Sequence, residues 1–177
     1  MSNKQTPSQT VGPYFAYGLT PEQYLYDFKQ LAANQMVNPT ITDNFITITG
    51  KVFDGANQPI PDAMVEIWQN DGEKQLFGRF GTGTDAENRF IFHTIKPKAV
   101  DGQAPHLSVI LFMRGQLIHT YTRIYFSDEV VLNAKDTVLN SVPEERKATL
   151  MAQQTSAGKY EFNIYMQGDK ETVFFDI

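Results

Sequence analysis

From Phe45 onward, the sequence alternates between apolar and polar residues in short runs that turn residues separate. Alternation with a period of two is typical of half-buried β-strands. One run, Val109–Met113, is continuously apolar, which predicts a strand that is buried on both faces. Short strands, tight turns and few helices predict an all-β fold, an antiparallel β-sandwich with short helices. The predicted strands cover residues 45–54, 63–68, 88–97, 106–115, 117–126, 159–168 and 171–177.

Two stretches outside these strands carry helix signals. Thr20 can cap a helix, Pro21 suits the first helical position, and Gln23 completes a capping box. Apolar side chains continue at helical spacing as far as Leu31, which predicts a short amphipathic helix there. Residues 141–152 can form one or two helical turns.

The first 19 residues are polar and rich in turn residues, yet they contain Tyr14, Phe15 and Tyr17. This pattern predicts an extended N-terminal arm instead of a regular element. An arm with aromatic side chains packs either on its own domain or on a neighbouring chain whose pocket it completes. At this length, residues 1–177 are expected to form a single domain.

Composition excludes several classes of function. With a formal net charge of −5 and no run of Lys or Arg, the chain lacks the basic surface that nucleic-acid binding needs. No apolar run approaches the length of a membrane span, so no membrane partner and a cytoplasmic location are expected. The absence of cysteine excludes disulfides, thiolate nucleophiles and zinc–thiolate sites.

Three histidines, His93, His106 and His119, are the candidate metal ligands, and each is 13 residues from the next. This spacing forms no local chelate. A three-histidine site assembled by the fold and separate structural roles both stay open, and separate roles are favoured. His106 begins a predicted strand, and Ser108, two residues on, faces the same way.

Other motifs carry weaker signals. No G-x-S-x-G motif displays Ser108 as a nucleophile, and the glycines of residues 78–83 are interpreted as turn glycines. Arg114, at the end of the apolar strand, can serve an internal salt bridge or an anionic ligand. For Arg123, an internal salt bridge to an acidic residue is favoured, since burying an unpaired charge is costly.

Several segments resemble, in order and over almost the whole chain, the α subunits of intradiol ring-cleaving dioxygenases. The most distinctive are "TPSQTVGPYF" at 6–15, "IWQ" at 67–69 and "QGDKETVFFDI" at 167–177. The resemblance implies a β-sandwich. It also implies that a similar β subunit is the partner, and that only the β subunit holds the non-haem ferric ion.

The same resemblance implies a specific loss in this chain. The strand of His106 carries two same-face histidines in the iron-bearing subunit, and two tyrosinates complete the ligands. Here Ser108 occupies the second position, and residues 94–102 and 69–77 lack the two tyrosines. With three of four ligands missing, the resemblance implies no metal ligands and no catalytic residues in this chain. It also implies that Fe(III) is bound by the partner β subunit and that His106 is hydrogen-bonded within the core.

The resemblance further implies an oligomer of αβ units that cleaves 3,4-dihydroxybenzoate with O₂ to 3-carboxy-cis,cis-muconate. The α chain supplies part of the pocket wall, and its arm, residues 1–19, packs on the partner. A stand-alone β-sandwich binding protein that has lost this chemistry is the alternative, but such a protein has no use for the arm and the arginine. The implied substrate-binding residues are Thr10, Gly12, Pro13, Tyr14 and Arg114.

Overall fold

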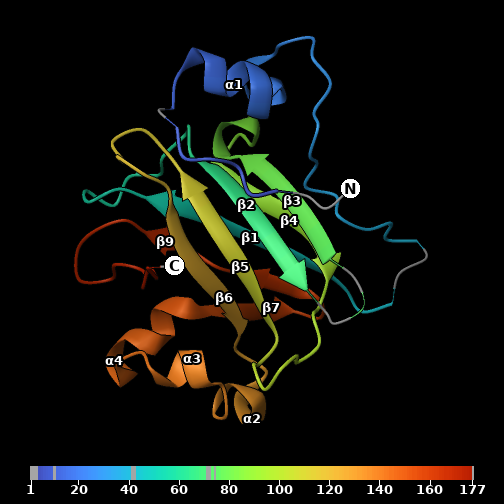
Figure 1. The fold of residues 1–177 in the computed structure, drawn as a ribbon, viewed down its shortest axis with the longest axis vertical. Coiled ribbons are helices and arrows are strands. Elements are labelled where there is room, and N and C mark those ends of the chain that lie inside the picture. The colour runs from blue at the N-terminus through green and yellow to red at the C-terminus, as the bar shows by residue number, and fades with distance from the viewer. Residues whose placement is uncertain (1–3, 10, 41–42, 71–72, 74, 177) are drawn as a thin grey trace.

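The computed structural model describes residues 4–9, 11–40, 43–70, 73 and 75–176. Nine strands form one sheet that folds back on itself into two layers (Figure 1). The strand bounds are β1 (Phe45–Phe53), β2 (Met64–Asn70), β3 (Gln75–Gly81), β4 (Arg89–Ile95), β5 (His106–Phe112), β6 (Thr120–Phe126), β7 (Met151–Ser156), β8 (Lys159–Glu161) and β9 (Ile164–Tyr165).

The strand order is β3-β2-β5-β6-β7-β8-β1-β4, and β9 pairs with β1. Strand β7 joins the layer β3-β2-β5-β6 to the layer β8-β1-β4. Most pairs are antiparallel, but β6–β7, β1–β8 and β1–β9 are parallel. The predicted β-sandwich is therefore confirmed, with mixed pairing where the chain crosses between layers.

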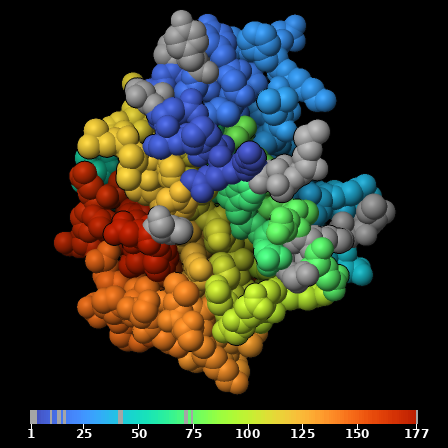
Figure 2. All heavy atoms as spheres, viewed as in Figure 1, coloured from blue at the N-terminus to red at the C-terminus, as the bar shows by residue number. Residues whose placement is uncertain are grey.

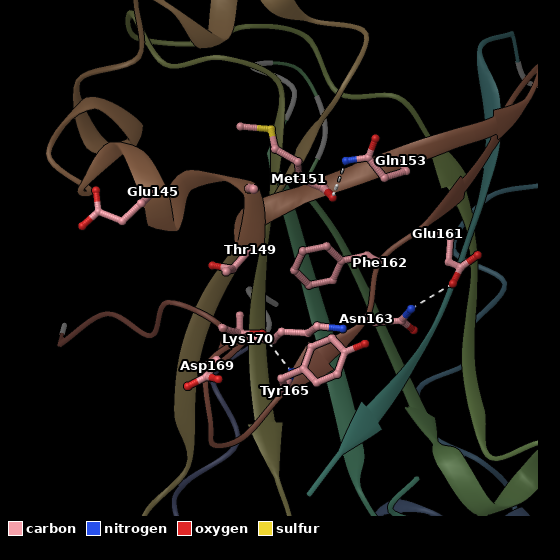
Figure 3. A pocket seen from close by; sticks show the side chains of 12 residues that line it. Glu145, Thr149, Met151, Gln153, Glu161, Phe162, Asn163, Tyr165, Asp169 and Lys170 are labelled. Carbon is pink, nitrogen blue, oxygen red and sulfur yellow. Dashed lines mark hydrogen bonds between the residues drawn. The ribbon is translucent and has the colours of Figure 1, made fainter. Parts of the chain in front are cut away.

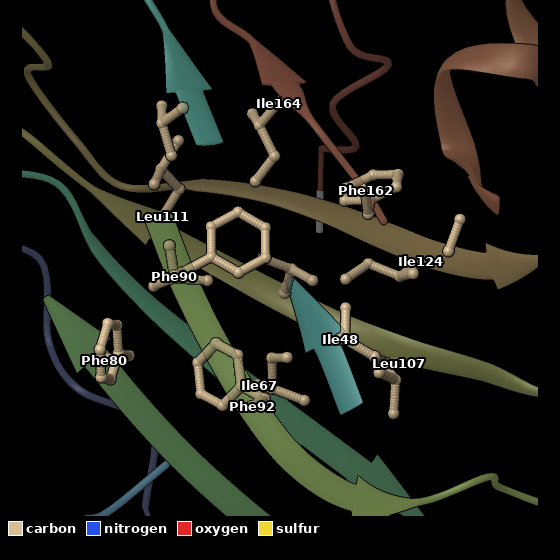
Figure 4. Packing of buried hydrophobic residues seen from close by; sticks show 14 of the residues in the cluster. Ile48, Ile67, Phe80, Phe90, Phe92, Leu107, Leu111, Ile124, Phe162 and Ile164 are labelled. Carbon is tan, nitrogen blue, oxygen red and sulfur yellow. The ribbon is translucent and has the colours of Figure 1, made fainter. Parts of the chain in front are cut away.

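The core lies between the two layers and is filled by alternate side chains of the facing strands (Figure 4). Strand β1 alternates strictly between half-buried and buried positions, as its period-two pattern predicts. Val109–Phe112 of β5 are all buried, which confirms the prediction from the continuous apolar run. Ile48, Ile67 and Phe92 are fully enclosed, and burial of each such side chain contributes about 1.5–3 kcal/mol.

The helices are short: α1 (Pro13–Leu19), α2 (Val130–Asn133), α3 (Thr137–Asn140) and α4 (Glu144–Lys147), with 3₁₀ turns at Pro21–Tyr24, Thr82–Thr84 and Ala148–Leu150. Helix α4 and the turn after it confirm the helical turns predicted within 141–152. None of the described helices is long and apolar enough to cross a lipid bilayer.

Two predictions near the N-terminus are corrected. The amphipathic helix expected as far as Leu31 ends after one 3₁₀ turn, because Leu25 adopts a left-handed conformation (φ 57°) and Leu31 is 81% exposed. The arm expected to be extended is helical from Pro13 to Leu19. Proline suits the first position of that helix, and burial of Phe15 against Phe112, with ring centroids 5.8 Å apart, stabilises it.

The sequence also misplaces strands. Gly78 and Gly81 lie within β3 and not in a turn, and Gly78 packs closely under the side chain of Met36. Strand β7 escapes prediction because its residues after Ala152 are polar and exposed. The predicted C-terminal strand is wrong for the residues described, because Phe175 makes only a single bridge to Tyr121.

The outer face of the β3-β2-β5-β6 layer is covered at both ends (Figures 1 and 2). The arm and α1 cover one end, where Phe15 packs on Ile110 and Phe112. Helices α2–α4 lie over the other end, where Leu139 packs on Tyr125. Strand β5 runs from the helical end to the arm end, so each of its termini meets a different covering segment.

Candidate functional site

The arm end of β5 opens into a cavity of about 570 Å³. Gly12 of the arm and Arg114, just beyond β5, both line it, although they are distant in sequence. The structure therefore brings together two of the five predicted substrate-binding residues. The remaining lining residues are Val11, Gln23, Tyr24, Tyr26, Pro61, Asp62 and Gly83.

Arg114 stands on the turn between β5 and β6, where Gly115 supplies a left-handed conformation (φ 86°) that favours glycine. The Arg114 Nε forms an ion pair with Asp62 Oδ2, so the internal salt bridge left open by the sequence exists. The Arg114 side chain is nevertheless 71% exposed, so most of it stays open to solvent. The guanidinium can thus hold Asp62 and still offer N–H groups to an anion in the cavity.

A surface cluster of four aromatic residues, Tyr17, Tyr24, Tyr26 and Phe28, borders this cavity. The rings of Tyr17 and Tyr26 stack with centroids 4.1 Å apart, and Tyr26 also contacts Tyr24 and Phe28. Phe28 is 60% exposed, and the neighbouring Leu25 is 93% exposed. Burial and the Asp62 charge raise the pKa of Tyr24, so its phenol stays protonated at neutral pH.

Sequence reasoning missed this cluster because it assigned the segment to a helix. The available signal was the alternation of Tyr24, Tyr26 and Phe28 every second residue, which indicates an extended segment. Asp62 carried no signal beyond its place in a proline turn, because its role arises only when that turn meets Arg114.

The other predicted arm residues lie wholly or partly outside the described part of the chain. Thr10 lies outside the described residues, and so do the side chains of Pro13 and Tyr14, which begin α1. At Gly12, an added Cβ would meet no heavy atom within 4 Å. The packing of this chain therefore does not itself require glycine at position 12.

The helical end of β5 holds a second, smaller cavity, of about 320 Å³. His106 and Ser108 line it from β5, and Trp68 and Gln69 from β2. His106 Nδ1 lies 2.8 Å from the carbonyl oxygen of Ala104, which fixes that nitrogen as the donor. Burial lowers the pKa of His106, so the imidazole is neutral at pH 7.

Arg123 stands beside this second cavity, directly opposite Ser108 in the β5–β6 register. Its Nη1 donates to Gln103 Oε1 at 2.7 Å and to the Tyr125 hydroxyl at 3.2 Å. The predicted salt bridge of Arg123 to an acidic residue is wrong, because these described partners are an amide and a phenol and not a carboxylate. The guanidinium adds positive charge next to His106, and this charge acts with burial to lower the pKa of His106.

These groups do not fit a ferric ion. Fe(III) is a hard cation that favours several anionic oxygen ligands, whereas the cavity offers one neutral imidazole, a serine hydroxyl, side-chain amides and a single carboxylate, that of Asp101, beside a cation. Over the described ranges, no three His, Asp or Glu side chains gather in a geometry that could hold a metal. No catalytic step can be derived through iron at this end of β5.

The remaining two histidines have local partners on other strands. His93, on β4, lies 3.1 Å from the Thr47 hydroxyl and stacks on Phe45. His119 Nε2, just before β6, lies 2.6 Å from the Tyr121 hydroxyl. The three histidines thus make separate contacts within the described structure.

A third cavity, of about 520 Å³, lies between α4, β7–β9 and the segment after β9 (Figure 3). Its wall includes Glu145, Phe162 and Asp169, and Lys170 lies over the ring of Tyr165. None of the described residues predicted to bind substrate is part of this wall. Gly12 and Arg114, which are predicted to bind substrate, therefore line the cavity at the arm end of β5 and not this one.

No family model matches the chain. The protocatechuate 3,4-dioxygenase alpha chain of Burkholderia cepacia is 47% identical to it over 98% of both chains. The beta chain from the same organism is 28% identical, over 80% of this chain and 72% of that one. Among solved structures, the intradiol ring-cleavage dioxygenase of Tetranychus urticae superposes with a TM-score of 0.60 at 15% identity, over 96% of this chain and 99% of that one. The fold and the near-complete match together show that the chain belongs to the protocatechuate 3,4-dioxygenase alpha-chain family of intradiol dioxygenases.

Proposed function

We propose that this chain completes an active site whose iron is held by a partner β chain, and that the αβ pair cleaves 3,4-dihydroxybenzoate with O₂ to 3-carboxy-cis,cis-muconate. Intradiol dioxygenases are non-haem iron enzymes, so the metal supplies the redox chemistry. The observation that carries the proposal is the contrast between the ends of β5. Gly12 and Arg114 share an open cavity at one end, and the ligand-poor His106 cavity lies at the other.

In this proposal Arg114 binds the carboxylate of the substrate. A guanidinium can donate two parallel N–H bonds to one carboxylate, which fixes the orientation of the ring as well as its position. Asp62 holds the Arg114 Nε and so limits the rotamers of a long side chain that is otherwise exposed. This restraint reduces the conformational entropy that Arg114 loses when a substrate binds.

The surface beside the cavity supports a protein partner at this end. Exposed aromatic residues are typical of protein interfaces, and Tyr24 and Tyr26 belong both to the aromatic cluster and to the cavity wall. A partner that covers the cluster would close the cavity and exclude water from it. Contact with such a partner would also explain glycine at position 12, where this chain leaves free space. We propose the β chain as this partner, with the arm, residues 1–19, at the contact.

Separate expression and co-expression test the proposal. The two chains are purified alone and together, and iron content and 3,4-dihydroxybenzoate cleavage are measured for each. We expect iron in the β chain and in the complex, and full turnover only in the complex. A β chain that turns over at the same rate and KM without this chain would contradict the proposal. A stable lone monomer that never pairs with β would favour a stand-alone binding protein.

A single domain and a cytoplasmic location are also predicted. Residues 1–177 are expected to unfold as one domain, which a single calorimetric transition would support. A cytoplasmic location is expected, which fractionation of cells that express the native chain would test.

A further inference from the structure

A buried ionic contact lies beneath the N-terminal arm. Glu66 of β2 and Arg79 of β3 are opposite each other in the strand register and project from the outer face of the sheet. Arg79 Nε and Nη2 donate to Glu66 Oε1 at 2.9 and 2.8 Å. Glu66 is fully buried and Arg79 is 6% exposed, so water does not screen the pair.

Thr6 of the arm is the third member of this contact. Its hydroxyl donates to Glu66 Oε1 at 2.5 Å and accepts from Arg79 Nη2 at 3.0 Å. Thr6 is 7% exposed, whereas the flanking Gln5 and Pro7 are exposed. The hydroxyl thus joins both charges at once, and hydrogen bonds to ionised groups are stronger than neutral ones.

The Glu66 carboxylate depends on this arrangement. Its other oxygen, Oε2, is buried and has no hydrogen-bond partner in the part of the chain that the structure describes. All of its described hydrogen bonds therefore converge on Oε1, and one of them comes from the arm. Among the described contacts, Thr6 is the one uncharged donor to this buried carboxylate. Without the Thr6 hydroxyl, Oε1 would accept hydrogen bonds from Arg79 alone.

A second fixed point lies on the far side of the proposed site residues. Phe15 is 5% exposed and packs on Met64, Ile110 and Phe112 of the same outer face. The arm segment that contains Thr10, Gly12, Pro13 and Tyr14 therefore runs between two buried anchors, Thr6 and Phe15. A short chain held at both ends has few conformations left, so its position is set before a substrate arrives.

We propose that Thr6, Glu66 and Arg79 form a latch that positions this arm segment for substrate binding. The inference rests on the proposed function and extends it. The three residues are positioning residues: they lie beneath the arm and act through Gly12 and its neighbours without touching the substrate. The same sandwich thus carries Arg114 at the cavity and anchors the arm that contributes Gly12 to the cavity lining.

The test uses the αβ complex with Thr6→Val, which keeps the shape of the side chain and removes its hydroxyl. We expect the KM for 3,4-dihydroxybenzoate to rise about tenfold while kcat changes less than about twofold, as for the loss of a binding contact. Backbone amides of residues 4–12 should exchange hydrogen at least about tenfold faster, while those of β2 and β5 should not change.

Matched variants make the result specific. Thr6→Ser keeps the hydroxyl and should restore the wild-type KM and exchange. Thr137→Val makes the same chemical change at an exposed position of α3, at the opposite end of the fold, and should leave both unchanged. A Thr6→Val complex with KM within twofold of wild type, or a Thr6→Ser complex as impaired as Thr6→Val, would overturn the latch.

The latch and the proposed function fail separately. The proposed function is tested by comparing the β chain alone with the wild-type complex, and the latch by comparing variants within a complex that turns over. If Thr6→Val does not assemble with the partner, exchange is measured on the full chain alone. Faster exchange confined to residues 4–12 would then support the latch, and unchanged exchange would overturn it.

Discussion

The two ends of strand β5 have the same neighbours, β2 and β6, yet they differ in what they can bind. At the His106 end two polar side chains have local partners: His106 contacts Ala104, and Arg123 contacts Gln103 and Tyr125. At the Arg114 end the cation stays mostly exposed beside an open cavity and an apolar surface. The cation at the first end is thus held by local partners, whereas the cation at the second end is mostly free to meet a ligand.

A fold can thus take on a different role without a change of architecture. The relatives of this chain include both alpha and beta chains, and the sandwich is common to intradiol dioxygenases. At the His106 end, Ser108 and the cation of Arg123 lie beside a single histidine, a set of groups that suits Fe(III) poorly. At the Arg114 end, the surface has an open cavity, which we propose the partner chain closes.

The two buried carboxylates behind these ends give the largest expected effect. Glu66→Gln leaves Arg79 buried without its counter-charge and should destabilise the chain by about 3–5 kcal/mol. Asp136, buried at the His106 end, accepts from Ala104 N, Leu139 N and the Tyr125 hydroxyl and pairs with no cation among its described contacts. Asp136→Asn should cost less, about 1–3 kcal/mol. Urea unfolding of both variants measures the order, and the reverse order would contradict it.

The second prediction contrasts the two ends in the αβ complex. Arg114→Ala should raise the KM for 3,4-dihydroxybenzoate about tenfold, equal to about 1.4 kcal/mol of binding. Because Arg114 is mostly exposed, thermal stability should change little. Arg114→Lys keeps the charge but loses the planar fork, and it should give an intermediate KM. His106→Asn should leave the KM unchanged. An effect of His106→Asn equal to that of Arg114→Ala would remove the functional difference between the ends.

The third prediction concerns the space beside Gly12. Gly12→Ala should change the unfolding free energy of the isolated chain by less than about 0.5 kcal/mol, because the added Cβ meets nothing. The same variant should weaken pairing with the β chain or raise the KM of the complex, because the partner or the substrate would occupy that space. Equal behaviour of wild type and Gly12→Ala in both assays would mean that position 12 faces neither.

The smallest effect is a difference in pH dependence between the ends. The pKa of His106 is lower in the folded chain than in the unfolded chain. As the pH falls below about 6.5, the unfolded chain therefore binds a proton before the folded chain does, and the folded state loses stability. Near the Arg114 cavity, the hydrogen bond from Arg89 lowers the pKa of Asp85 below 3.8. The ionised Asp85 carboxylate therefore stabilises the fold above about pH 3.8, and this stabilisation is lost as the pH falls through the pKa of Asp85 in the folded chain.

Unfolding free energies between pH 3 and pH 8 separate the two groups. His106→Asn should flatten the curve between pH 5 and 7, and Asp85→Asn should flatten it only below about pH 4. If His106→Asn changes nothing above pH 5, the histidine is not buried as neutral imidazole, and the network at that end is weaker than its geometry indicates.

The sequence predicted the parts of the fold in which local pattern and burial agree. Strands such as β1 and β4 alternate because one face lies on the core, so their period is visible in the residues alone. Strand β3 was missed because its glycines serve close packing and not turns: Gly78 lies under Met36, and Gly81 lies against Gln23. Strand β7 was missed because it bridges the two layers with mostly exposed polar residues.

The site was predictable only where a motif carried it. Gly12 and Arg114 came from the resemblance to a family, and the structure places both on one cavity. Tyr24, Tyr26 and Asp62 were missed because their contribution depends on how the segment after α1 and a proline turn meet in space. The latch at Thr6 was hidden for the same reason, because a threonine in a polar arm carries no local sign of burial.

Metal analysis of the separately purified chain shows whether this chain can hold iron by itself. The chain is expressed alone in iron-supplemented medium, purified and assayed for bound iron beside the αβ complex. The donor set at His106 predicts iron far below one atom per chain in the isolated protein, with no tyrosinate-to-Fe(III) absorption, and iron in the complex. One ferric ion bound tightly by this chain alone would contradict the account.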